Sequence, residues 1–152
     1  MVRLGIFWTI FILFIGCGSP DETLPYPLTI TQEGLGPLHP TTPFEEVPTA
    51  MIGFESQKLS LISPDQTEVI YAISKGSHTV AHVFSDTSGK KIDAIHVLSV
   101  HVQDVHGQKI GSALEASIPC GNGRCSDPSS PSISYEIDPK TRIIRQINYQ
   151  RL

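Results

Sequence analysis

The stretch that decides the fold is Ser132-Ile-Ser-Tyr-Glu-Ile-Asp-Pro-Lys-Thr-Arg-Ile-Ile-Arg-Gln-Ile-Asn-Tyr149. Apolar and polar residues alternate before and after Asp138-Pro139-Lys140-Thr141, a tetrapeptide of turn-forming residues. Successive side chains of a strand point to opposite faces, so this alternation predicts a hairpin with one buried face. The residues expected on that face are Ile133, Tyr135 and Ile137 in the first strand, and Ile143, Ile147 and Tyr149 in the second.

The same period of two continues outward from this hairpin through most of the chain. Proline, glycine, asparagine and aspartate separate the alternating segments, as in antiparallel strands joined by turns. We therefore predict an α+β fold dominated by antiparallel β-sheet. The expected strands cover residues 28–33, 55–62, 68–74, 79–84, 92–102, 132–137 and 142–149.

Two short segments carry helix-start signals. Thr42-Pro43-Phe44-Glu45 and Ser112-Ala113-Leu114-Glu115 both match the capping box, in which a hydroxyl and a glutamate satisfy the first N–H groups of a helix. Pro48 and Pro119 would end these helices within a turn or two. Each box follows an expected strand and a glycine-containing turn, which suggests two degenerate strand–helix–strand repeats.

The N-terminus has the features of an export signal. Arg3 precedes an apolar run over residues 4–15, which is shorter than the roughly 20 residues that a membrane-spanning helix needs. Phe14-Ile15-Gly16-Cys17 resembles the lipobox of bacterial lipoproteins, which implies cleavage before Cys17 and attachment of lipid to it. The alternative is an ordinary leader or a core helix with a chance cysteine.

This interpretation divides the chain into three parts. Residues 1–16 form the signal peptide, residues 17–27 the lipidated cysteine and a proline-rich flexible tether, and residues 28–152 a single domain. Gly18, in place of the aspartate associated with inner-membrane retention, favours the outer membrane, with the domain facing the periplasm. The membrane is thus an expected partner, through the lipid on Cys17.

The charge and the cysteines indicate which kinds of partner and ligand the protein could bind. Lys and Arg number 11 against 15 Asp and Glu, and the net charge of −4 argues against a nucleic-acid partner. Cys120 and Cys125 enclose Gly-Asn-Gly-Arg, whose flexible residues let a short ring close, so we expect a disulfide in an exported chain. Zinc is the competing use of this pair, but structural zinc sites need four ligands.

No residue set amounts to a convincing catalytic or cofactor site. We therefore predict no catalytic residue, no metal and no cofactor. The chain has six histidines, and a cross-strand cluster of His82 with His96 or His101 is the arrangement that could bind metal. An enzyme would need such histidines to converge with Asp93 or Asp104 in a pocket.

Several short motifs occur in an order that resembles a known family. They are Gly34-x-Gly36-Pro37-Leu38, Thr42-Pro43-Phe44, Lys109-Ile110-Gly111, the cysteine pair and Ile133-Ser134-Tyr135. The chain is similar in these motifs to a family of bacterial envelope lipoproteins of unknown function, typified by the sigma-E-regulated lipoproteins of enteric bacteria. The resemblance implies a periplasm-facing lipoprotein of envelope maintenance, without catalytic residues to transfer.

The leading functional hypothesis is a non-catalytic domain that binds an envelope protein or a cell-wall component. The last hairpin, residues 132–149, is the expected exposed edge, with Tyr135 or Tyr149 as its contact residues if either faces solvent. Two alternatives are an envelope hydrolase or metal-dependent enzyme that uses histidines, and an inhibitor of cell-wall-degrading enzymes.

Overall fold

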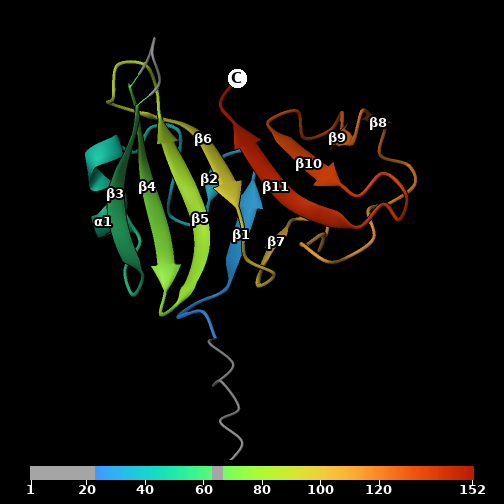
Figure 1. The fold of residues 1–152 in the computed structure, drawn as a ribbon, viewed down its shortest axis with the longest axis horizontal. Coiled ribbons are helices and arrows are strands. Elements are labelled where there is room, and N and C mark those ends of the chain that lie inside the picture. Colours follow the sequence, from blue (N-terminus) through green and yellow to red (C-terminus); the bar gives the residue numbers. More distant parts are fainter. Residues whose placement is uncertain (1–22, 63–66) are drawn as a thin grey trace, which may run out of the picture.

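The computed structural model describes residues 23–62 and 67–152 (Figure 1). The predicted signal peptide, the predicted lipid-attachment residue Cys17 and most of the predicted tether lie outside these ranges. Within them, no helix has the length and the apolar character that crossing a membrane requires.

Two β-sheets make up most of the fold. The large sheet has eight antiparallel strands in the order β3-β4-β5-β6-β11-β10-β9-β8, and the small sheet has the order β2-β1-β7, with β1 parallel to β7. The strands are β1 Leu28–Thr31, β2 Gly34–Leu35, β3 Glu55–Ile62, β4 Thr67–Lys75, β5 His78–Ser85, β6 Ile92–Val97, β7 Val102–Asp104, β8 Cys120–Gly121, β9 Arg124–Ser126, β10 Ile133–Ile137 and β11 Ile144–Gln150.

The predicted fold class is confirmed, and two strand predictions need correction. The single strand expected over residues 92–102 is two strands, because the chain leaves the large sheet after Val97 and enters the small one at Val102. In the last hairpin, a bulge after Glu136 makes Ile137 the partner of Ile144. The bulge shifts the alternation, so that Ile144 is buried and Ile143 is exposed.

One hydrophobic core joins the two sheets and the segments between them. Its largest fully buried side chains include Tyr135 and Tyr149 from the large sheet, Ile30 from the small sheet and Phe44 from the helix. Leu24 and Tyr26, which the sequence analysis assigned to the tether, also pack against this core.

Only the first of the two predicted helices is present. It consists of the 3-10 turn η1, Phe44–Glu46, followed by α1, Val47–Ala50. Neither element has a side-chain cap, so the predicted capping box is wrong. Thr42 Oγ1 instead accepts the N–H of His39, and Glu45 accepts from Lys58 and Tyr71.

The second predicted helix is absent because its segment is short and otherwise bonded. Residues 115–119 separate Leu114 from β8, whereas residues 45–54 separate Phe44 from β3. The Arg142 guanidinium donates to the carbonyls of Glu115 and Ile118, at 2.7 and 3.2 Å. These hydrogen bonds hold the segment as a loop.

The strand connectivity repeats within the chain. In the first half, β1 precedes the four-stranded meander β3-β4-β5-β6, and in the second half β7 precedes the meander β8-β9-β10-β11. The last strands of the two meanders, β6 and β11, pair and so join the halves. The predicted repeat is thus present in the strands, without a second helix.

Backbone hydrogen bonds repeat with the strands. Phe44 N–H donates to the carbonyl of Lys90, at 2.9 Å, as Leu114 N–H does to that of Arg142, at 3.0 Å. Asp86 and Asp138 open the final turn of each meander, and the Oδ1 atom of each accepts two N–H groups of that turn. Each meander also carries a bulge just before this aspartate, after Phe84 and after Glu136.

Candidate functional site

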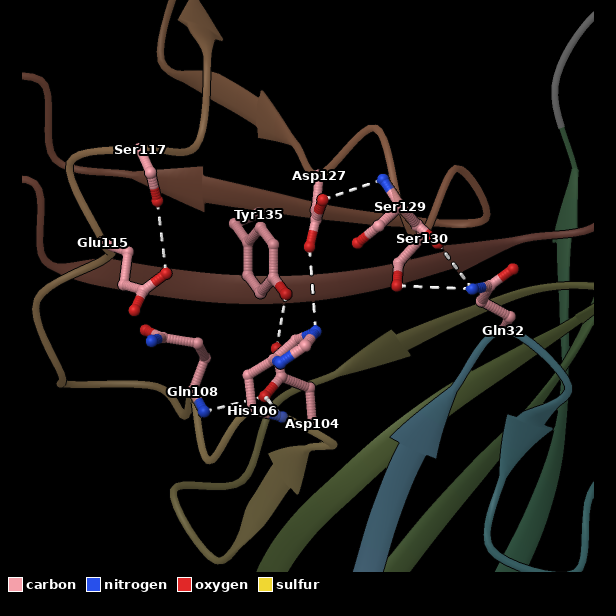
Figure 2. A network of polar contacts seen from close by, with 10 residues as sticks. All are labelled: Gln32, Asp104, His106, Gln108, Glu115, Ser117, Asp127, Ser129, Ser130 and Tyr135. Carbon is pink, nitrogen blue, oxygen red and sulfur yellow. Dashed lines mark hydrogen bonds and ion pairs between the residues drawn. The ribbon is translucent and has the colours of Figure 1, made fainter.

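A buried carboxylate lies at the junction of the two sheets. Asp104 at the end of β7 is 2% exposed, and its Oδ2 accepts the hydroxyl of Tyr135 on β10. Its Oδ1 accepts the N–H groups of His106 and Gln108, both at 2.8 Å (Figure 2). Both oxygens are therefore engaged in holding the turn after β7 against the large sheet.

Further polar contacts connect the turn after β7 to the segment between β9 and β10. His106 Nε2 lies 3.7 Å from Asp127 Oδ2, and Ser129 N–H donates to Asp127 Oδ1 at 2.8 Å. Hydrogen bonds from Ser129 hold the Asp127 pKa below its usual value. Gln32 donates to the Ser129 carbonyl, at 2.7 Å, from the turn after β1 (Figure 2).

The hydrogen bonds of this network hold the turn after β7 in place against the large sheet. Burial, followed by the hydrogen bond to Asp104, raises the pKa of Tyr135 far above its ordinary value, so its hydroxyl stays protonated and donates. Both oxygens of Asp104 already accept hydrogen bonds from the protein, and the residue is almost fully buried, so it is placed to hold these donors together. A smaller hollow of about 550 Å³ beside the network is lined by Thr31, Gln32, Glu33, Val105 and Ser130.

Two of the six histidines are neighbours. His82 and His96 are register partners on β5 and β6, as the cross-strand hypothesis allowed. Burial lowers the pKa of His96, whose ring packs against Phe84 with the ring centroids 4.4 Å apart and the ring planes tilted by 50°. His101 lies in the loop before β7. The Asp93 carboxylate accepts a hydrogen bond from the side chain of Gln150. Among the described residues, no three His, Cys, Asp or Glu side chains are gathered to hold a metal ion.

The last hairpin is not an edge of the sheet, contrary to the sequence-based prediction. β11 pairs with β6 on one side, and β10 pairs with β9 on the other, so both strands are internal. Tyr135 and Tyr149 are 0% and 2% exposed and face the core. The edges of the large sheet are β3 and β8.

The disulfide lies at the β8 edge of the large sheet, opposite the β3 edge. Cys120 and Cys125 are bonded and are register partners on β8 and β9. Between them, Asn122 and Gly123 adopt positive φ angles of 52° and 79°, which turn the chain back in a few residues. The Gly123 carbonyl accepts the N–H of Ile137 at 3.0 Å, which holds this tight turn beside the residue that precedes Asp138.

A broad hollow of about 940 Å³ lies between these two turns. Its walls carry two guanidinium groups, because Arg124 on β9 pairs with Glu136, at 3.2 Å, and Arg145 on β11 bonds Asp138. Both arginine side chains remain about two-thirds exposed, at 66% and 67%. The residues that line the hollow are Gly121, Asn122, Gly123, Arg124, Glu136, Ile137, Pro139 and Arg145.

The cysteine pair of this site is recognisable in the sequence as a disulfide, whereas the two arginines carry no such signal. Arg124 lies inside the cysteine ring, and Arg145 is the extra residue that the bulge of β11 turns outward. No alternation pattern marks a bulged residue, because the bulge itself interrupts the alternation. The pairing of β10 with both β9 and β11 then brings the two arginines to one hollow.

The fold defines a class of proteins built on one extended antiparallel sheet of two meanders that packs on a small mixed sheet. The crystal structure of the uncharacterized protein yfeY from Escherichia coli is similar to this chain, with a TM-score of 0.66. The two are 18% identical, and the similarity covers 81% of this chain and 99% of that chain. No family model and no curated protein matches the sequence.

This similarity shows the fold. It is also consistent with the resemblance to a family of unknown function in enteric bacteria, because the structural neighbour is itself an uncharacterized protein of such a bacterium.

Proposed function

We propose that this protein is a lipid-anchored, non-catalytic binding protein of the bacterial envelope, related to the sigma-E-regulated lipoproteins. Supporting the anchor are the apolar run over residues 4–15 and the lipobox-like Phe14-Ile15-Gly16-Cys17. On this proposal the chain is lipidated on Cys17 and held at the outer membrane, facing the periplasm. The domain then acts by holding a partner close to that membrane.

The binding site is the hollow between the disulfide turn and the Asp138 turn. The observation that carries this assignment is the pair of exposed arginines, Arg124 and Arg145, on its walls. A guanidinium has five N–H donors, and each of these carboxylate pairings leaves some of the donors free. A ligand carboxylate can therefore bind both side chains without displacing a core contact.

The partner that fits this hollow is an acidic segment of another envelope protein. Glycines and Asn122 at the disulfide turn leave the backbone accessible, so an extended peptide can approach it closely. Carboxylates of that segment would then pair with the two guanidiniums in the bidentate geometry that arginine favours.

Photo-crosslinking in intact cells tests this assignment. A photo-reactive side chain at Pro139, in the hollow, should capture one envelope protein reproducibly, and the same group at Gln57 on the β3 edge should not. Capture should fall about tenfold in the double variant Arg124→Ala/Arg145→Ala, because two arginine–carboxylate pairings with the partner are lost together and an exposed pairing contributes up to about 1 kcal/mol.

Lys58→Ala is the matched control, because Lys58 is also exposed and paired with a glutamate, but lies on β3. Capture that survives the double arginine variant would refute the hollow as the binding site. If the captured protein is a cell-wall-degrading enzyme, the inhibitor alternative becomes the specific form of the proposal.

A further inference from the structure

One end of the molecule gathers exposed apolar side chains. Six large apolar residues are exposed in the described part of the chain, and three of them, Ile52, Leu98 and Val100, lie in loops at this end. Their exposed fractions are 76%, 38% and 51%. Exposed apolar groups that cluster are a sign of a contact surface.

The loop that holds Ile52 lies beside the beginning of the described chain. Tyr26 meets Phe54 edge-on, with the ring centroids 5.4 Å apart. Lys75, at the end of β4, donates to the carbonyl of Gly53 at 3.3 Å. Ile52 is thereby placed next to both the entering chain and the β4–β5 turn.

The loop that holds Leu98 and Val100 reaches the same end. The parallel register of β1 and β7 pairs Leu28 with Val102, so the turn that carries Val100 directly precedes the strand that pairs with the start of β1. Leu98 N–H also donates to the carbonyl of Val80 near the start of β5, at 2.9 Å. In Figure 1 the β4–β5 turn and the starts of β1 and β7 all lie toward the lower end, opposite the C-terminus.

The length of the preceding chain limits how far this end can lie from a lipid on Cys17. Only residues 18–23 separate Cys17 from Leu24, and Leu24 already packs on the core. Fully extended, that link spans roughly 25 Å. Glu55 and Lys75, which lie beside the Ile52 loop, have opposite signs, so an apolar contact rather than a basic patch is the expected mode.

We infer that this end of the domain rests on the lipid bilayer, with Ile52, Leu98 and Val100 inserted in its interfacial region. The inference rests on the lipid anchor of the proposed function and adds a second, weaker attachment that sets the orientation of the domain. The residues that line the hollow belong to the β8–β11 part of the large sheet, which does not include the loops of Ile52, Leu98 and Val100.

Tryptophan fluorescence can test this orientation, because the only tryptophan of the chain, Trp8, lies in the predicted signal peptide. The mature lipidated protein, which begins at Cys17 and so lacks Trp8, would carry either Ile52→Trp or, as a control at the opposite end, Leu152→Trp. Both positions are highly exposed, at 76% and 84%, so neither change disturbs the core. Each variant would be reconstituted into phosphatidylcholine vesicles whose acyl chains are brominated.

Emission of the Ile52→Trp variant should fall by more than half relative to vesicles without bromine, while that of the Leu152→Trp control stays nearly constant. Val100→Trp should behave like Ile52→Trp. Equal quenching at positions 52 and 152, in protein that floats with the vesicles, would overturn the orientation and leave the anchor standing. Protein that does not float would overturn the anchor itself.

Discussion

The two halves of the molecule share one backbone plan and stabilise it differently. In residues 28–97, long strands and a short helix bury Phe44 under the meander. In residues 102–150 the strands are shorter, a loop replaces the helix, and a disulfide closes the outer hairpin. Corresponding turns, bulges and backbone hydrogen bonds recur in both halves, although their sequences differ.

The recurring hydrogen bonds belong mostly to the backbone, so the side chains of each half are free to differ. Tyr135 occupies the position of Val83, one residue before the corresponding bulge. Only the tyrosine has a hydroxyl to bond Asp104. In the same way, Arg145 replaces Asp93 as the extra residue of the bulge, and it lines the hollow.

The largest expected effects come from the equivalent core residues Phe44 and Leu114. Phe44→Ala should lower the free energy of unfolding by about 4 kcal/mol and Leu114→Ala by about 3 kcal/mol, because both side chains are buried and the first is larger. Urea unfolding measures both. A greater loss for Leu114→Ala would mean that the loop of the second half carries more of the core than the helix of the first.

Breaking the contact between Asp104 and Tyr135, which only the second half has, should cost less than the loss of Phe44. Asp104→Ala leaves the Tyr135 hydroxyl and two backbone N–H groups without their acceptor, so we expect a loss of about 3 kcal/mol. Tyr135→Phe removes one donor alone and should cost about 1.5 kcal/mol. Equal losses in the two variants would show that the turn after β7 does not depend on Asp104.

Removal of the disulfide tests whether the second half needs its covalent link. The double variant Cys120→Ser/Cys125→Ser should lose about 2 kcal/mol, since the closed ring is short and constrains the unfolded chain modestly. Reduction of the unaltered protein should give the same shift of the unfolding midpoint. An unchanged midpoint would mean that the β8–β9 turn is already fixed by its backbone conformation.

The matched turns offer the sharpest test of equivalence. Asp86→Ala and Asp138→Ala each remove an acceptor of two turn N–H groups, so each should cost about 1 kcal/mol. The corresponding Asn variants retain an acceptor oxygen and should cost less. Losses of stability that differ severalfold between the two sites would show that the two turns are not equivalent.

The smallest expected effect is a pH dependence at the seam between the halves. Burial lowers the pKa of His96 in the folded protein, so the unfolded chain takes up the proton first as the pH falls. This stability is complete above the unfolded pKa of roughly 6.5 and is lost as the pH falls toward the folded value. Unfolding midpoints should therefore fall between about pH 7 and pH 5, and less steeply in His96→Gln.

The sequence predicted the strands that alternate and missed what interrupts or shortens the alternation. β3 was predicted with its observed bounds, whereas β8 and β9 are too short to show a period. The bulge before Asp138 hid the burial of Ile144, because it adds one residue to β11. The second helix was predicted from its first residues, although the short distance to β8 and the bonds of Arg142 decide the outcome.

The candidate site was less predictable than the fold. Asp104 and Tyr135 are distant in the sequence, and their contact depends on how the small sheet lies on the large one. The hairpin over residues 132–149 was recognised, but the number of neighbours that flank it cannot be derived from its own pattern. That number decides whether Tyr135 is a contact residue or a core residue.

The parallel pairing of β1 with β7 has a consequence for the order of folding. The meander β3-β4-β5-β6 joins strands that are adjacent in the sequence, so it can form as soon as those residues are available. Leu28 finds its partner Val102 only after the whole first meander has been made. In a chain that is delivered from its N-terminus, the first strand is therefore completed late, and its free edge needs protection until β7 arrives.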